Sequence, residues 1–137
     1  MPKLKPPRKL RCEYQINPLG LDARAPRFSW ELDDSRRNAR QTAYQIVTDN
    51  GWDSGRVRSD QSIHVPYTGP ALKSRERVAW KVRTWDAQGK PSPWSVSAFF
   101  EMGLLEPGDW VGAWVGSPLV GGERTTSPCP FLRRPFT

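Results

Sequence analysis

The sequence predicts an antiparallel β-sandwich built from short strands. Apolar and polar residues alternate in one segment after another, which is the period of an extended strand with one buried face. The chain also contains 14 prolines and 11 glycines in 137 residues, so turns interrupt it at short intervals. About seven such strands, with no helical period between them, are typical of a sandwich.

Length and composition set the limits of this prediction. A chain of 137 residues forms one domain with an ordinary core but not two. No stretch approaches the roughly 20 apolar residues of a membrane span, and the basic start lacks the apolar run of a signal peptide. We therefore expect no membrane partner. The location stays unknown, with the cytoplasm favoured and secretion of a longer parent protein still possible.

Four regions are expected along the chain. Residues 1–9 are a flexible basic lead-in, 10–103 form the sandwich, 104–116 form a tryptophan-containing linker, and 117–137 are the truncated start of a following β-domain. In the last region Phe131, Leu132 and Phe136 form a strand-like apolar segment with no later segment to pair with. A region this short cannot bury a core by itself.

Seven alternating segments are expected to form the strands. In chain order they span residues 10–16, 27–32, 41–49, 52–57, 62–67, 78–85 and 96–102. The longest alternation, 78–85, predicts a central strand, whereas Pro66 suits an edge strand or a strand end because it has no backbone N–H to donate. Asn50-Gly51 predicts a two-residue type I′ turn in which both residues have positive φ, and Asp53-Ser54-Gly55 is compatible with a second bend or bulge in the segment that follows.

Alternation also predicts which side chains form the core. The apolar face should carry Phe28, Trp30, Tyr44, Ile46, Trp80 and Val82, buried together between two sheets. Lys81 and Arg83, which have the opposite phase on the central strand, should point outward.

Several short segments, in this order, resemble the N-terminal region of bacterial α-L-rhamnosidases of glycoside hydrolase family 78. They are LRCEY at 10–14, NPLG at 17–20, PRFSW at 26–30, QTAYQI at 41–46, WDSG at 52–55, SDQS at 59–62, WKVRTWD at 80–86 and FEMGLL at 100–105. The resemblance covers residues 10–116 and implies a fibronectin type III or immunoglobulin-like sandwich. PFLRR at 130–134 resembles the first strand of the next, sugar-binding-like module of these enzymes.

The resemblance implies that this chain is not itself an enzyme. Members of the family cleave terminal α-L-rhamnosides with inversion, using two acidic residues in an (α/α)6 barrel far downstream, so no catalytic residue is assigned here. The remaining domains of the parent enzyme would be the partners. One departure concerns the tyrosine corner of such sandwiches: counting six residues from Leu72 places Val78 where the tyrosine would stand.

No metal, cofactor or acid-base site is indicated. His64 is the only histidine, and Asp33-Asp34 stands where a strand gives way to a loop, so turn formation explains it. Cys12 and Cys129 belong to no metal-binding pattern and predict no disulfide. The net charge of +7 and pI near 9.9 raise a polyanion-binding alternative, but the basic residues are scattered, and a nucleic-acid partner is not favoured.

The tryptophans are the candidate contact residues. Exposed indoles stack on sugar rings, which makes Trp52, Trp85, Trp94, Trp110 and Trp114 candidates for contact with carbohydrate or with another domain. In the alternative interpretation, Trp94 packs on Arg83 or Lys81 as a cation-π layer, and Trp110 and Trp114 pack on the neighbouring domain. Three functions remain open: a structural accessory module, a carbohydrate-binding module and a basic polyanion-binding domain.

Overall fold

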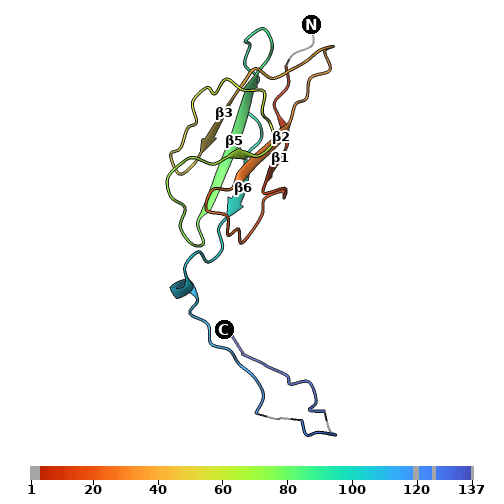
Figure 1. Ribbon diagram of the computed structural model, residues 1–137, viewed down its shortest axis with the longest axis vertical. Coiled ribbons are helices and arrows are strands. Elements are labelled where there is room, and N and C mark those ends of the chain that lie inside the picture. Colours follow the sequence, from red (N-terminus) through yellow and green to blue (C-terminus); the bar gives the residue numbers. More distant parts are fainter. Residues whose placement is uncertain (1–3, 119–120, 125, 137) are drawn as a thin grey trace.

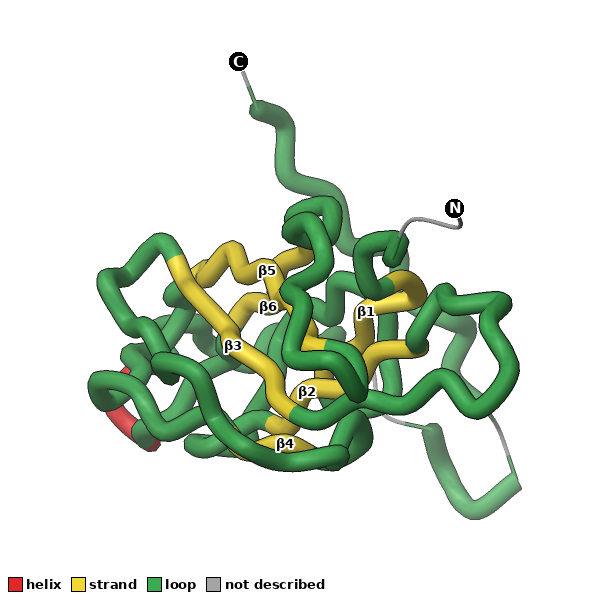
Figure 2. The backbone as a smooth tube through the Cα atoms, turned by 90° about the horizontal axis from the view of Figure 1, so that it is seen from above, coloured by secondary structure: helices red, strands yellow, loops and turns green. Residues whose placement is uncertain are grey.

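The computed structural model describes residues 4–118, 121–124 and 126–136, and it shows two antiparallel sheets packed face to face (Figures 1 and 2). One sheet has the order β1 (Arg8–Cys12), β2 (Arg27–Glu31), β4 (Val65–Pro66), and the other has the order β3 (Ala43–Thr48), β5 (Arg77–Trp85), β6 (Ala98–Glu101). A 3-10 turn, η1 (Pro107–Asp109), follows β6. The predicted sandwich is confirmed, with six regular strands in the described part of the chain.

The longest predicted strand is central in its sheet, as expected. β5 pairs with β3 from Ala43↔Trp85 to Thr48↔Trp80 and with β6 from Arg77↔Glu101 to Trp80↔Ala98. Pro66 lies in the two-residue edge strand β4, where its missing N–H leaves no gap in a central ladder.

The segment 52–57 pairs with β3 but is not a regular strand, and its irregularity lies at Asp53-Ser54-Gly55, where the sequence allowed a bend or bulge. It does lie along β3: the N–H groups of Tyr44 and Val57 each donate to the other residue's carbonyl, at 2.9 and 2.8 Å. Just before Val57, Gly55 takes a left-handed φ of 63°, and the Ser54 hydroxyl accepts the Ile46 N–H at 2.9 Å. A side chain thus replaces one rung of the ladder, and the pairing is irregular.

The predicted type I′ turn at Asn50-Gly51 is wrong. Only Gly51 of the pair has a positive φ, 91°, and the Thr48 N–H donates across the loop to the Trp52 carbonyl at 2.9 Å. The connection is therefore a three-residue loop in which a glycine in the left-handed region follows a turn. The Asn50 side chain instead donates to the Tyr67 hydroxyl at 2.8 Å.

The first strand is also shorter and earlier than predicted. It begins at Arg8 and ends at Cys12, because Glu13 and Tyr14 adopt positive φ values of 45° and 67°. The Glu13 carboxylate reaches across to β2 and accepts the Arg27 N–H at 2.7 Å and its guanidinium at 2.8 and 3.0 Å. Alternation continues to residue 16 in sequence only, and the Ile16 side chain is exposed.

Four other predicted strands are also shorter, two of them at their ends only: 27–32 is regular over Arg27–Glu31 and 41–49 over Ala43–Thr48. In the segment 62–67, His64 has a positive φ of 56°, so only Val65–Pro66 is regular. The predicted strand over 96–102 is regular only over Ala98–Glu101. Side chains from distant parts of the chain bind the backbone in these two segments: the His64 N–H donates to the Ser29 hydroxyl at 3.3 Å, and the Phe99 N–H donates to the Asn17 side-chain carbonyl at 2.9 Å.

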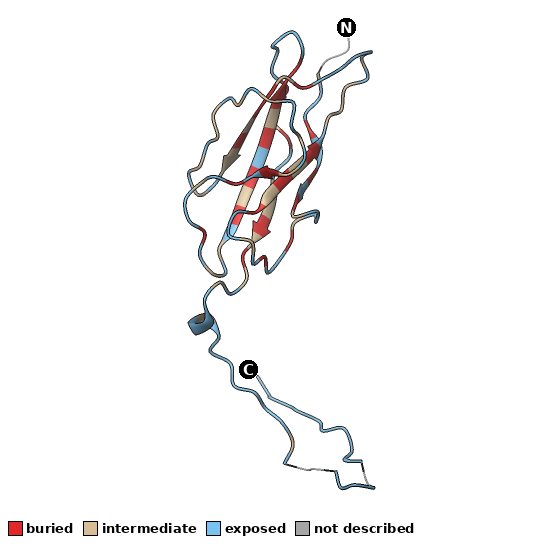
Figure 3. Ribbon diagram, viewed as in Figure 1, coloured by how far each residue is buried: buried red, intermediate tan, exposed pale blue. Residues whose placement is uncertain are grey.

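The predicted core is confirmed. Its six predicted members all belong to the buried cluster between the sheets, which Figure 3 shows as alternate red positions along the strands. The Phe28 and Trp80 rings meet at 4.3 Å between centroids, and Phe100 lies 5.9 Å from Phe28. Lys81 is exposed and Arg83 half-buried, so the central strand has the predicted register.

A tyrosine anchors the loop before β5, although not at the usual corner position. The Tyr67 hydroxyl donates to the Pro70 carbonyl at 3.0 Å, and its ring packs on Phe28 and Trp52. A Cβ atom on Gly69 would lie 2.4 Å from the Tyr67 hydroxyl oxygen, so this position requires glycine. Sequence counting from Leu72 could not find this anchor.

Replacing Trp80 by alanine should destabilise the domain far more than replacing Trp94. Trp80 is 1% exposed, and removing a buried aromatic costs about 3 to 5 kcal/mol, a large part of the roughly 5 to 15 kcal/mol that holds such a domain folded. Trp94 is only half-buried, and its loss should cost about 1 to 2 kcal/mol. Urea melts of both variants measure the difference, and a larger loss at Trp94 would contradict the assigned register.

The two cysteines should react with thiol reagents at very different rates. Both are free; Cys129 is exposed, whereas burial and then the charge of Glu13 raise the pKa of Cys12 to about 12. Native protein should therefore release one equivalent of chromophore with a disulfide reagent, and the second only after unfolding. The Cys129→Ser variant should react negligibly while folded. Rapid reaction of that variant would show that β1 opens in the native state.

Candidate functional site

The end of the sandwich where the chain leaves β6 is held by backbone pairing. The Met102 N–H donates to the Glu76 carbonyl at 2.8 Å and the Gly103 N–H to the Leu21 carbonyl at 2.7 Å. The Arg75 N–H in turn donates to the Gly103 carbonyl at 3.0 Å. The chain is thus clamped between two loops as it leaves the fold. We call residues 103–109 the exit segment.

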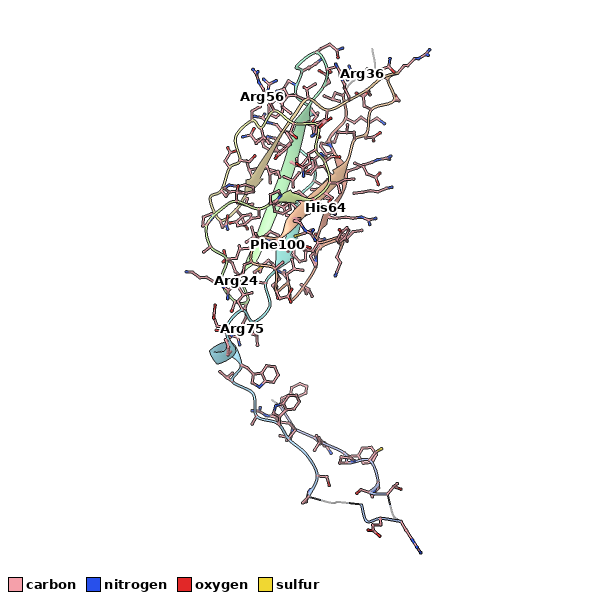
Figure 4. All side chains as sticks on the ribbon, viewed as in Figure 1. Arg24, Arg36, Arg56, His64, Arg75 and Phe100 are labelled. Atoms are coloured by element: carbon pink, nitrogen blue, oxygen red, sulfur yellow. The ribbon has the colours of Figure 1, made fainter. Side chains whose placement is uncertain are left out.

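Side chains extend this clamp over the whole exit segment. The Ser74 hydroxyl accepts the Leu105 N–H at 2.8 Å and donates to the Asp109 carboxylate. The Arg75 guanidinium donates to the Asp109 carbonyl at 2.9 Å, and Arg24 donates to the Leu105 carbonyl at 3.1 Å. Arg24 and Arg75 both lie at the end of the sandwich next to η1 (Figure 4).

The short turn η1 is closed by its own residues. The Asp109 carboxylate accepts the Glu106 N–H at 2.9 Å, and the Asp109 N–H donates to the Glu106 carbonyl at 3.0 Å. Hydrogen bonds from Ser74 and the Glu106 N–H, together with the Arg75 charge, hold the pKa of Asp109 below its ordinary value. The path of the chain is therefore defined up to Trp110.

Two of the candidate tryptophans lie beyond this segment. Trp110 is 59% and Trp114 93% exposed, and their rings are stacked with centroids 6.2 Å apart. Figure 1 shows this part of the chain running away from the sandwich as an extended tail. Phe131, Leu132 and Phe136, the apolar residues of the predicted following domain, are also exposed.

Two other candidate tryptophans belong to a cation-π ladder on the outer face of the β3-β5-β6 sheet. The Arg83 guanidinium lies between them, 4.6 Å from the centre of the Trp94 ring and 5.0 Å from the nearest ring centre of Trp85. The Lys81 ammonium lies 5.4 Å from the centre of the Trp94 ring, and the Arg56 guanidinium lies 4.8 Å from the centre of the Trp85 ring. The alternative interpretation placed Trp94 on Arg83 or Lys81, and the structure shows its ring in contact with both.

Hydrogen bonds hold both the Arg83 guanidinium and the segment that carries Trp94. Gln45 accepts two N–H groups of Arg83, at 2.9 and 2.7 Å, and the Gln45 amide donates to the Asp53 carboxylate. The Ser92 and Ser95 hydroxyls accept N–H groups of β5 at 3.0 Å, which holds the segment that carries Trp94. Sequence reasoning missed Gln45, which lies opposite Arg83 in the β3-β5 ladder, and also Asp53 and Arg56, which an irregular segment brings to the same face.

The remaining candidates are structural. Trp52 is half-buried and packs on Phe28 and Tyr67. Asp34 and Asp86 both bind Arg36, at 2.6 and 2.9 Å, and the pKa of Asp34 is lowered by its hydrogen bonds with Arg36. Asp33 in turn forms an ion pair with Lys5, so both residues of the Asp33-Asp34 pair are ion-paired loop residues.

Neither a metal site nor a membrane span is found in the part of the chain that the structure describes. Within residues 4–118, 121–124 and 126–136, histidine, cysteine, aspartate and glutamate form no group of three that could hold a metal ion. The helical content there is one short 3-10 turn, and no described helix has the length and hydropathy to cross a bilayer.

The fold and the exit segment together define an immunoglobulin-like sandwich from which the chain continues in a defined direction. Residues 7–106 match the family described as Rha78A-like, N-terminal immunoglobulin domain, and the chain belongs to this family. An α-L-rhamnosidase of Streptomyces avermitilis is 44% identical over 115 residues, which are 77% of this chain and 11% of the relative. One from Alteromonas sp. strain LOR is 37% identical over 138 residues, 89% of this chain and 15% of the relative.

Solved structures show the same relationship. The crystal structure of the Streptomyces avermitilis α-L-rhamnosidase complexed with L-rhamnose superposes with a TM-score of 0.79 at 41% identity, covering 82% of this chain and 12% of that one. The α-L-rhamnosidase from Dictyoglumus thermophilum gives 0.76 at 35% identity, covering 86% and 14%. The chain therefore spans only a small part of the proteins that it resembles.

Removing the Asp109 carboxylate should loosen the exit segment without unfolding the sandwich. Because the pKa of Asp109 is lowered, the charged form stabilises the segment above that pKa, and this contribution is lost as the pH falls through it. At neutral pH, Asp109→Asn should speed hydrogen exchange at the amides of Leu105 and Glu106 several-fold. Glu123→Gln, a carboxylate removed from the exposed tail, is the matched control, and equal exchange in both variants would contradict this account.

Proposed function

We propose that this chain is a non-catalytic accessory module of an α-L-rhamnosidase-like glycoside hydrolase and that its role is to position the domain that follows it. The observation that carries this proposal is the exit segment, which Ser74, Arg75 and Arg24 fasten to the sandwich. A flexible tether would need none of these contacts. A rigid connection transmits the orientation of one domain to the next.

The carboxylates of the sandwich do not suit hydrolysis. Inverting glycosidases use two carboxyl groups about 6.5 to 9.5 Å apart, one protonated to assist the leaving group and one charged to activate water. Here Glu13 is bound by Arg27 and Asp34 by Arg36, and hydrogen bonds to these arginines lower both carboxyl pKa values. Groups held in the charged form cannot serve as a general acid near neutral pH. In this proposal, catalysis resides in a barrel domain of the parent.

The exposed tail residues suit contact with the following domain. Trp110 and Trp114 are stacked on each other and leave most of their surface uncovered, directly after the exit segment. Large exposed aromatic surface close to a rigid connection is typical of a contact between domains. In this proposal both rings, with Phe131, Leu132 and Phe136, pack against the next domain of the parent enzyme.

The same stacked pair favours a second candidate function, which is carbohydrate binding. Trp110 and Trp114 are the candidate tryptophans with the most exposed rings. Trp85 is 7% exposed and Trp52 is half-buried in the core, so neither offers a platform for a sugar ring. The basic polyanion alternative is weakened because several cations are already paired with carboxylates: Lys5, Arg8, Lys9, Arg24, Arg27, Arg36 and Arg77.

A domain replacement tests the positioning role. In the Streptomyces avermitilis α-L-rhamnosidase, the part that this chain matches is replaced by residues 7–114 of this chain. The hybrid should release rhamnose from an aryl rhamnoside and melt in one transition, while the 137-residue chain alone should release none. Introducing Ser74→Ala together with Arg75→Ala should lower the melting temperature of the hybrid by several degrees.

The control is a pair of substitutions of the same types away from the exit segment, Ser97→Ala with Arg58→Ala, which should leave the hybrid unchanged. A hybrid that is equally stable with and without the exit contacts would refute the positioning role. Rhamnose release by the chain alone that disappears with one aspartate or glutamate substitution would refute its non-catalytic character.

A further inference from the structure

The outer face of the β1-β2-β4 sheet carries an open groove of about 630 Å³. The inward positions of β1 and β2 are buried, so their alternate residues Lys9, Arg11, Ser29 and Glu31 face outward and line it. Tyr14 and Ile63, from the two irregular loops beside these strands, also line it, together with Trp30, Leu32 and Ser62. The volume lies in the range of about 300 to 1,000 Å³ that is usual for ligand sites.

This face differs from the opposite outer face of the sandwich. There the cation-π ladder of Trp94, Arg83 and Trp85 covers the sheet with the domain's own side chains. Here Tyr14 and Ile63 are each 60% exposed and lie uncovered at the groove. Exposed apolar groups that border a groove mark a binding surface more often than isolated exposed residues do.

The Tyr14 ring is held in a fixed position. The His64 ring meets it edge-on at 5.0 Å, and the Arg27 guanidinium lies 5.6 Å from its centre. Tyr14 and His64 both adopt left-handed backbone conformations, with φ of 67° and 56°, which are unfavourable for these residues and are retained where the surroundings require them. A ring that is already ordered loses little conformational entropy when a ligand stacks on it.

The charge of the groove is positive. Lys9 and Arg8 share the single carboxylate of Glu31, at 3.1 and 3.8 Å. Arg11 is exposed and has no ion pair within the part of the chain that the structure describes. The lining of the groove therefore carries two cations, Lys9 and Arg11, and one carboxylate, and the groove is complementary to an anion. An arginine without a partner can bind a carboxylate through two parallel hydrogen bonds.

The mixture of side chains favours a saccharide over a protein surface. Lysine, glutamate and serine are depleted at the centre of protein-protein contacts, yet Lys9, Glu31 and Ser29 all line this groove. A sugar ring has an apolar face that stacks on an aromatic ring and hydroxyls that bond to such polar groups. We propose that this groove binds an acidic saccharide, with a uronic acid carboxylate at Arg11 and a sugar ring on Tyr14. The proposal goes beyond the positioning role and does not depend on it.

Titration calorimetry of the 137-residue chain with tetragalacturonate tests the site, with maltotetraose as the neutral comparison. At about 50 mM salt, tetragalacturonate should bind in the millimolar range or tighter and roughly tenfold more tightly than maltotetraose. Tyr14→Ala and Arg11→Glu should each weaken binding roughly tenfold or more, while Tyr14→Phe, which keeps the ring, should retain it. Thermal melts establish whether each variant is folded. If Arg11→Glu is not folded, Arg11→Gln takes its place, and if Tyr14→Ala is not folded, Tyr14→Ser takes its place.

One control variant and one discriminating variant keep the test specific. Lys90→Glu makes the same change in charge as Arg11→Glu, in the turn that follows β5 of the other sheet, and should leave the dissociation constant unchanged. Trp114→Ala removes one ring of the tail pair that is the other candidate sugar platform, so this variant distinguishes the two sites. Absence of tetragalacturonate binding, equal losses in Lys90→Glu and Arg11→Glu, or a loss in Trp114→Ala alone would each overturn the proposal. Equally tight binding of decathymidylate that survives Tyr14→Ala would show a polyanion surface instead and would also overturn it.

Discussion

The contact between Phe28 of β2 and Trp80 of β5 joins the two sheets, and the rest of the structure depends on it. Their ring centroids are 4.3 Å apart, both side chains are almost completely buried, and Phe100 and Tyr67 pack around Phe28. Three-stranded sheets of this size expose too much surface to be stable alone, so each needs the other as its cover. Once these two rings define how the sheets face each other, the outward positions of every strand follow from the pleat.

Those outward positions are used in opposite ways on the two faces. On the β3-β5-β6 sheet, Arg83 lies between the Trp85 and Trp94 rings and is bound by Gln45, so the sheet is covered without a partner. On the β1-β2-β4 sheet, the short strands leave Tyr14 and Ile63 exposed beside a groove with excess positive charge. One outer face of the sandwich is thus covered by the domain's own side chains, whereas the other carries an open groove. The two sheets share one core but differ at their surfaces.

At the end of the sandwich, hydrogen bonds define the direction in which the chain leaves the fold. Loops from distant parts of the chain, carrying Arg24, Ser74 and Arg75, converge on the exit segment and hold it through backbone and side-chain hydrogen bonds. In the proposed parent enzyme this arrangement would turn an ordinary fold into a positioning element. The related α-L-rhamnosidases are far longer than this chain, which covers 11% and 15% of the two sequences compared above.

Much of this was determined by the sequence alone. Period-two alternation placed Phe28, Trp30, Tyr44, Ile46, Trp80 and Val82 in the core, because a strand can bury only one face whatever surrounds it. Only the tertiary structure decided where the strands end. Glu13 leaves the alternation to bind Arg27, and Asn50 turns to Tyr67 in a loop with one left-handed residue rather than two. The groove and the exit segment were likewise invisible in the sequence, since their residues come from segments up to 82 positions apart. Local patterns specify which way a side chain points, whereas hydrogen bonds between distant loops exist only after the sheets have packed.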